Sequence, residues 1–517
     1  MSAGLHRILH SGHQDERLVG PAAPWYAKPV DKTGRYTTQW RRVDFDTTPA
    51  FGTRATASIP VAGELITRAY IVSTLPSFGP GLARAAAKAA ANHQTFIGPN
   101  IGYTNSLGHA LLQQVSLTIG NTAFDVLDSR LLETMDEYET PLEQIPNVNS
   151  MICRATDGFY AGLYGGAGPG PGPGPVITAT PLPFWCFRGD LKTALPVDAL
   201  SASRVQIVAD FRRMEELVVS DNVPYTPIGE AIAAAEASTG TTTQISGADP
   251  CLNLATIDTT ALNFYSEAAG GTSYTLINGI DFGPLRLGET YIMIEYVYLD
   301  KLEAAAWRNG NIQYPITQHR TFPIVQTAGS KNIVIDLPFN NPVRFLYFSL
   351  QRVEAAAANM HFHAARDVVR YNDISAGLWW PDASGLTYDA PGFLIPGYSG
   401  LQSEPLEAIE LTYEGKYVKV RTENPALYRS LLPALEKTKT PWVNRYYYCI
   451  PLSLGSSADN DAAGEVNWNK ITTKTLTLTL AKPLGTDVMP NYNVYIHVES
   501  CNVFNIYGGT GSLLFDY

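Results

Sequence analysis

At two places along the chain the spacing of apolar residues changes from that of a strand to that of a helix. The predicted elements come in the same order at both places. In the stretch 115–139, apolar residues first recur at every second position, as in a strand with one buried face. They are Val115, Leu117 and Ile119. A Gly-Asn turn and a second short strand follow, and the apolar residues then take helical spacing, with Asp128 or Ser129 available as N-cap. The pattern predicts strand, turn, strand and capped helix.

The stretch 409–436 repeats this order. Apolar residues alternate at its start, Glu414-Gly415 predicts a turn, and a second strand returns. Asn424-Pro425 is typical of a helix start, with proline at the first helical position. An apolar helical stripe follows, made of Leu427, Leu431, Leu432 and Leu435.

The sequences on either side of the two blocks also correspond. A β-rich run precedes each block and two further runs follow it, although chance matching of short strands remains an alternative. The runs are 64–76, 182–188 and 204–211 around the first block, and 343–353, 445–450 and 475–480 around the second. The repeated order predicts an all-β chain of two tandem eight-stranded jelly rolls with short inserted helices and long surface loops.

The predicted division of the chain follows from these blocks and from stretches without a regular period. It consists of an N-terminal arm (1–35), a first jelly roll (36–300), a linker (301–311) and a second jelly roll (312–517). Loop insertions are expected at about 77–105, 158–176 and 214–275 in the first roll and at about 354–402 in the second. Alternating Gly and Pro near residue 170 exclude both a strand ladder and a collagen helix there.

Composition narrows the class of protein. Charged residues make up only 16% of the 517, which fits either a large β core or surface hidden in an assembly. The formal net charge of −11 disfavours a protein that coats nucleic acid. Five widely spaced cysteines favour free thiols, and the first 20 residues lack the apolar segment of a secretory signal. We therefore expect a protein made in the cytosol.

No linear motif of a nucleotide-binding loop, zinc protease or serine hydrolase occurs in the chain. His361 and His363 would share one face of a strand, but two ligands without a third are weak evidence for a metal. Trp379-Trp380 would suit a sugar-stacking surface or, in our preferred interpretation, a buried interface. The acidic cluster of Glu133, Asp136, Glu137 and Glu139 is interpreted as the solvated face of a helix. We predict no catalytic residue, cofactor or metal site.

Ordered short segments give the chain a family resemblance. They are Trp40-Arg41-Arg42, Gly63-Glu64-Leu65-Ile66-Thr67-Arg68, Asn105-Ser106-Leu107-Gly108-His109-Ala110, Pro183-Phe184-Trp185-Cys186, Tyr296-Val297-Tyr298-Leu299-Asp300, Asn467-Trp468-Asn469-Lys470-Ile471 and Phe504-Asn505-Ile506. In this order they resemble the major capsid proteins of nucleocytoplasmic large DNA viruses. That lineage of double jelly rolls includes iridovirus, phycodnavirus, asfarvirus and Faustovirus-like shells. The Ala-rich and Gly-Pro insertions and the tail depart from the family pattern.

The resemblance implies a structural protein of an icosahedral virion, assembled in the host cytoplasm and without enzymatic activity. It implies a homotrimer whose six jelly rolls form a pseudo-hexagonal capsomer. Neighbouring capsomers, minor capsid and penton proteins are the implied partners, an internal membrane can lie close by, and no direct nucleic-acid binding is expected. The alternatives are a carbohydrate-binding or carbohydrate-active tandem β-sandwich protein, which would need an aromatic cleft with paired carboxylates, and a minor capsid or scaffold role.

Overall fold

Two four-stranded sheets form the first half of the molecule. The computed structural model describes residues 35–80, 87, 94–97, 101–154, 175–220, 262–268, 274–280, 285–357, 359–366, 404–441, 445–454, 464–482 and 489–515. One sheet has the order β1 (Tyr36–Asp44), β13 (Thr290–Leu299), β3 (Leu65–Leu75) and β8 (Val176–Pro181). The other has the order β2 (Arg54–Ser58), β9 (Val205–Phe211), β6 (Leu112–Ile119) and β7 (Thr122–Asp128).

The second half repeats this arrangement strand for strand. One sheet contains β14 (Ile312–Thr321), β23 (Tyr492–Tyr507), β17 (Pro342–Arg352) and β20 (Tyr447–Pro451), with β15 (Val325–Gln326), β21 (Val466–Asn467) and β24 (Thr510–Leu513) attached. The other contains β16 (Asn332–Asp336), β22 (Lys474–Leu480), β18 (Leu406–Tyr413) and β19 (Tyr417–Thr422). In both halves the first, eighth, third and sixth strands share one sheet, and the second, seventh, fourth and fifth share the other. The predicted fold class of two tandem jelly rolls is confirmed.

The strands form where the sequence alternates. Along β22, and along β6 from Val115 onward, every second residue is buried, so each strand turns one face to its core. Gly120 has a φ of 67° at the β6–β7 turn, and Glu414 and Gly415 have φ values of 54° and 62° at the β18–β19 turn. Both repeated blocks therefore contain the predicted hairpin between the fourth and fifth strands of a roll.

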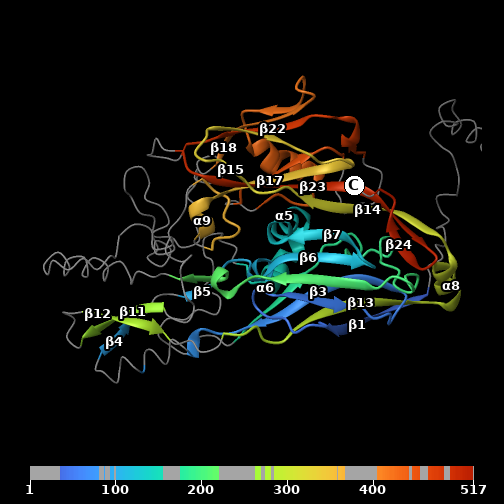
Figure 1. The fold of residues 1–517 in the computed structure, drawn as a ribbon, viewed down its shortest axis with the longest axis horizontal. Helices are drawn as coiled ribbons and strands as arrows, with labels where there is room; N and C mark the ends of the chain where they lie inside the picture. The colour runs from blue at the N-terminus through green and yellow to red at the C-terminus, as the bar shows by residue number, and fades with distance from the viewer. Residues whose placement is uncertain are drawn as a thin grey trace, which may run out of the picture.

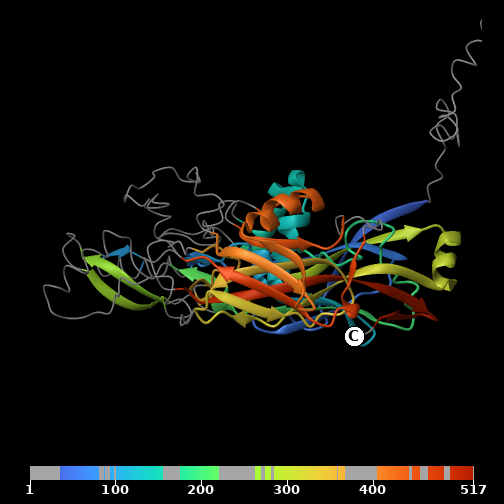
Figure 2. The ribbon, with the colours of Figure 1, turned by 90° about the horizontal axis from the view of Figure 1, so that it is seen from above.

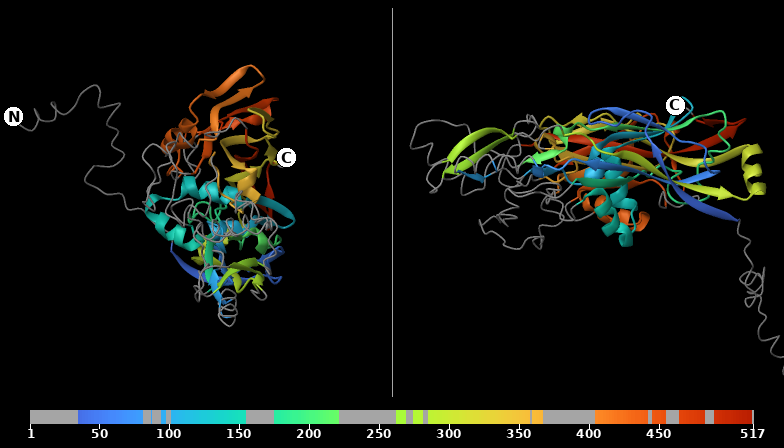
Figure 3. Two further views of the ribbon diagram at one scale, coloured as in Figure 1. Left: turned by 90° about the vertical axis from the view of Figure 1, so that its left-hand side faces the viewer. Right: turned by 90° about the horizontal axis from the view of Figure 1, so that it is seen from below.

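Short helices accompany the strands. They are α4 (Leu107–Leu111), α5 (Ser129–Glu139), η1 (Leu142–Gln144), α6 (Ile145–Ile152), η2 (Met214–Glu216), α8 (Lys301–Asn309), α9 (Val353–Ala357), η4 (Leu427–Leu431), α11 (Leu432–Glu436) and η5 (Trp468–Lys470). Asp128 caps α5, because its carboxylate accepts a hydrogen bond from the amide of Leu131 at 2.7 Å. Figures 2 and 3 show that α5, α6 and α11 project from the same side of the molecule.

Two details of the second helix differ from the prediction. The helical segment begins as a π-helix at Leu427, with Ala426 at the N-cap position, and not at Pro425. The predicted apolar stripe is also not buried, since Leu431 is 60% exposed and Leu435 is 75% exposed. In this chain alone, nothing covers that face within the part of the structure described.

The segment 182–188 was expected to be a strand and is a turn instead. The sixth strand of the first roll is β8, which ends at Pro181 and pairs with β3. Pro181 and Pro183 lack the amide hydrogen that a ladder requires, and this explains why pairing stops there. The aromatic residues that suggested a strand, Phe184 and Trp185, are buried in the core of the first roll.

Two of the predicted loop insertions contain a sheet of their own. β4 (Gln94–Ile97) pairs with β11 (Leu262–Ala268), which pairs in turn with β12 (Tyr274–Ile280). A further pair joins β5 (Ile101–Tyr103) to β10 (Val218–Ser220). Figure 1 shows the three-stranded sheet beyond one end of the rolls. The Gly-Pro segment and the Ala-rich segments lie outside the described residues, as do residues 1–34.

The two rolls lie side by side with α5 between them (Figure 1). Each roll has a core of its own, and Tyr138 of α5 belongs to the core of the second roll. In the residues described, no helix is both long enough and apolar enough to cross a bilayer.

Candidate functional site: the interface between the two jelly rolls

Helix α5 of the first roll contacts the second roll through its acidic face. Glu133 is fully buried and Glu137 is 3% exposed. Glu133 lies 3.2 Å from the guanidinium of Arg445, and Glu137 lies 3.8 Å from the ammonium of Lys439. Glu139 lies 3.3 Å from the ammonium of Lys437. The prediction of a solvated acidic face is therefore wrong, because a basic segment of the second roll covers it.

The same carboxylates also have partners within the first roll. Arg154 donates to Glu133 Oε2 at 2.6 Å, and His109 Nδ1 lies 2.8 Å from the same oxygen. Ser106 donates to Glu133 at 3.0 Å, and Arg154 also pairs with Asp136. Burial alone would raise the pKa of the Glu133 carboxyl, but the charges of Arg154 and Arg445 outweigh it and hold that pKa well below its usual value. Glu133 is therefore ionised inside the protein.

A second polar contact joins β7 to β14. Asp125 accepts a hydrogen bond from the backbone amide of His319 at 2.9 Å, and its other oxygen lies 3.0 Å from the His319 ring. Both side chains are fully buried. Burial would lower the pKa of His319, but the charge and hydrogen bond of Asp125 raise it overall. Gln318 also donates to the carbonyl of Phe124. These contacts fix the position of one roll relative to the other.

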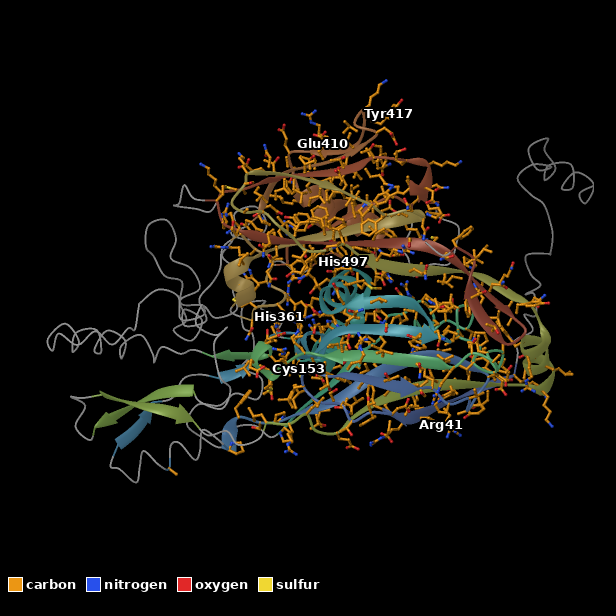
Figure 4. All side chains as sticks on the ribbon, viewed as in Figure 1. Arg41, Cys153, His361, Glu410, Tyr417 and His497 are labelled. Atoms are coloured by element: carbon orange, nitrogen blue, oxygen red, sulfur yellow. The ribbon has the colours of Figure 1, made fainter. Side chains whose placement is uncertain are left out.

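Arg130 and Tyr138 of α5 extend the interface over the outer face of the second roll. Arg130 donates to Gln351 at 2.7 Å and lies 3.9 Å from the ring centroid of Tyr495. The hydroxyl of Tyr138 donates to the carbonyl of Tyr447 at 2.8 Å. His497, labelled in Figure 4 between the rolls, lies 3.9 Å from a carboxylate oxygen of β7.

The long last strand β23 attaches the C-terminal end to the first roll. Phe504 packs against Phe124 and Trp185, with ring centroids 5.2 and 5.5 Å apart. After β23 turns back into β24, the carbonyl of Gly509 accepts a hydrogen bond from Ala202 at 3.0 Å. The C-terminal end of the described chain therefore docks on the first roll.

The residues singled out for chemistry do not form a site. His361 lies in a turn and not in a strand, where its Nε2 lies 2.6 Å from the carbonyl of Glu216. Burial and the charge of Arg212 lower its pKa to about 3. Among the described residues no group of three or more His, Cys, Asp or Glu is placed to hold a metal. Trp379-Trp380 lies outside the described residues.

The four cysteines that the structure describes are free thiols, as predicted. Burial raises the pKa of the Cys449 thiol to about 12, so it stays protonated. The densest cluster of carboxylates, on α5, is held by arginines and lysines in the interface between the two rolls, which we call the joint. The ion pairs and hydrogen bonds between the rolls hold the two rolls in one orientation, and this is a structural role.

The basic residues that complete the joint could not be found from the sequence. Arg445, Lys437 and Lys439 follow the second repeated block and are far in sequence from the acidic helix. No local pattern pairs them with it. The available signal was a cluster of carboxylates on one predicted helix, in a chain with few charges.

Two family models match the chain. One describes the N-terminus of major capsid proteins and covers residues 26–249. The other describes the major capsid protein of large eukaryotic DNA viruses and covers residues 307–512. Each falls on one of the two jelly rolls, and between them they span most of the chain.

Individual relatives are distant. The major capsid protein of Rana tigrina ranavirus is 22% identical over 443 residues, covering 84% of this chain and 77% of the relative. The major capsid protein of Phaeocystis pouchetii virus is 23% identical over 367 residues, covering 68% of this chain and 59% of the relative.

Solved structures share the fold. The capsid protein in the PBCV-1 virus capsid superimposes with a TM-score of 0.63 at 16% identity, covering 96% of this chain and 100% of that chain. The Faustovirus major capsid protein superimposes with a TM-score of 0.60 at 10% identity, covering 98% of this chain and 96% of that chain.

Proposed function

This chain belongs to the family of major capsid proteins of large eukaryotic DNA viruses, and on that basis we propose that three copies form the building block of the shell. Its role in the virion is structural. Six jelly rolls in a ring would give a pseudo-hexagonal tile. The partners of the tile would be neighbouring tiles and the minor and penton proteins of the shell. We propose no catalytic function.

The observation that carries the proposal is the repetition of one strand order in two rolls that are joined by buried polar contacts. The domains are proposed to be 36–300 and 312–517, with α8 as the linker between them. Two nearly equivalent rolls in one rigid chain allow a threefold ring to approximate sixfold symmetry. A joint that could bend would not define the shape of a tile.

The first test is the mass of the assembled protein. We expect native mass spectrometry and light scattering to show a homotrimer of the 56.3 kDa chain over a broad range of concentration. Negative-stain images of the same material should show particles with a six-sided outline. A protein that remains monomeric at all concentrations would overturn the proposal.

A further inference from the structure

The two equivalent edge strands β14 and β1 differ in burial. In β14 of the second roll, the four consecutive residues 316–319 are buried, because they lie against the first roll. In β1 of the first roll, every residue except Val43 is exposed. Both strands are the first of their roll and lie at the same edge of the same kind of sheet. One of these edges is therefore covered within the chain and the other is not.

The surface of the first roll that covers β14 has an equivalent in the second roll, and that equivalent is exposed. β14 packs against β7, and helix α5 after β7 is largely buried in the joint. β19 and the segment η4–α11 occupy the same place in the second roll. They expose Tyr417, Val418, Leu431 and Leu435, which are more than half accessible.

Each chain thus has two equivalent pairs of surfaces, of which one pair is in contact within the chain and the other is not. The fifth strand and helix of the first roll contact the first strand of the second roll. The fifth strand and helix of the second roll, and the first strand of the first roll, have no such contact in the described part of the chain. Figure 4 places Arg41 of β1 and Tyr417 of β19 at opposite ends of the molecule, so they cannot meet within one copy.

We propose that β19 and η4–α11 of one copy pack against β1 and the adjoining outer sheet face of a second copy. This deepens the proposed trimer and rests on it. The contact repeats between copies the arrangement that β7, α5 and β14 form within each copy. Because the two surfaces differ, the contact is heterologous, and a ring closes only when the rotation between rolls is suitable. A ring of three copies would contain three contacts within chains and three equivalent contacts between copies.

The chemistry of the two contacts differs. The contact within the chain is built from buried ions and hydrogen bonds, whereas the proposed contact is mainly apolar. On the β1 side the outer face offers Tyr36, Trp40 and Ile177, with exposed fractions of 54%, 42% and 62%. The Trp40 ring lies against Tyr70 of β3 at a tilt, with the ring centroids 5.6 Å apart, and this contact extends the apolar surface across the sheet.

Two arginines of these surfaces, one in β1 and one in β19, already have partners in their own chain. Arg42 pairs with Asp44 at 2.7 Å and with Glu289, and Arg421 lies 3.9 Å from Glu410. The attraction between copies should then come from burial of apolar area, which added salt does not screen.

Matched substitutions on the two edges of one sheet test the proposal. Val418 in β19 and Val334 in β16 lie in opposite edge strands of the same sheet, and both are more than half exposed. We expect Val418→Asp to weaken association by roughly tenfold or more, because the carboxylate would be buried without a partner. Leu435→Glu should do the same, and Val334→Asp should leave the trimer intact. Circular dichroism of each variant checks that the rolls are folded.

Cross-linking locates the contact. A chain carrying both Trp40→Cys and Val418→Cys should give covalent oligomers with a short bis-maleimide, and the single variants should not, which also controls for native thiols. The pair Trp40→Cys and Val334→Cys should give none. Suppose that the unaltered protein is a trimer, that Val418→Asp and Leu435→Glu assemble as well as Val334→Asp does, and that no cross-link forms. The assigned surfaces would then be wrong, and the proposed trimer would be unaffected. If the unaltered protein is monomeric, the proposed function itself fails.

Discussion

Replacing Glu133 with glutamine tests whether the buried charges hold the two rolls together. The substitution Glu133→Gln keeps the size of the side chain and removes its charge. The carboxylate is fully buried, 2.6 Å from Arg154 and 3.2 Å from Arg445. Arg445 would then lack its main counter-charge, and Arg154 would lose one of its counter-charges, in a fully buried site.

The expected loss of stability follows from this burial. Removing one partner of a buried ion pair costs about 3–5 kcal/mol. Asp136 and Glu137 remain near Arg154 and offset part of the loss, so we expect about 3 kcal/mol. The control is Lys331→Ala, which breaks an exposed pair with Glu407 at 2.7 Å and should cost about 0–1 kcal/mol.

The assay is urea unfolding at pH 7, followed by tryptophan fluorescence and circular dichroism so that separate unfolding of the rolls is detected. A double-mutant cycle with Arg445→Gln isolates the contact across the joint, for which we expect a coupling of about 1 kcal/mol or more. If Glu133→Gln costs no more than Lys331→Ala and the coupling is near zero, the joint does not depend on these charges.

Acid provides an independent readout of the same carboxylate. The pKa of Glu133 is lower in the folded protein than in the unfolded chain. Its stabilising contribution is therefore present above the unfolded value, near 4.5, and is lost as the pH falls through the folded value. Glu133→Gln should flatten the acid limb of the stability profile, and an unchanged acid limb would contradict the assignment.

Three further substitutions probe other parts of the molecule. Phe504→Ala should cost about 3–5 kcal/mol in urea unfolding and expose the β23–β24 end to limited proteolysis, because the ring packs between aromatic residues of the first roll. His319→Gln should lower stability more at pH 5 than at pH 9, because the raised pKa of His319 stabilises the fold below about 6.5 and this gain is lost as the pH rises through the folded value. Burial raises the pKa of Glu404 to about 7 against the opposing charge of Arg429. The folded state therefore loses stability as the pH rises from 4.5 to 7. Glu404→Gln should reduce the difference in unfolding free energy between pH 5 and pH 8 by up to roughly 3 kcal/mol. For His319 and Glu404, parallel profiles of variant and unaltered protein would refute the expectation.

The strands and hairpins could be predicted because their signals are local. β22 alternates cleanly, and Asp128 stands where a helix cap is needed, so neighbouring residues alone define these elements. The segment 182–188 misled because its aromatic residues suggested a strand while Pro181 and Pro183 had already ended the ladder.

The joint could not be predicted because its parts are distant in sequence. A helix with carboxylates on one face is usually solvated, and only the placement of Arg445 and Lys439 beside α5 reverses that interpretation. The leucine stripe gave the opposite error, since helical spacing suggested a buried face. Leu435 is exposed in the isolated chain, and a second copy is what we propose to cover it.

The two kinds of contact suit the circumstances in which each forms. Within one chain the linker α8 keeps the rolls together, so their association costs little entropy and the joint can include buried ions. Buried pairs such as Asp125 and His319 add little net free energy, but they allow only one orientation. Between copies the full entropy of association is lost, and apolar residues such as Val418 and Leu435 can supply the free energy to offset it. A duplicated roll can thus use its polar joint to set the angle and its apolar edge to drive assembly, which explains why equivalent strands carry such different residues.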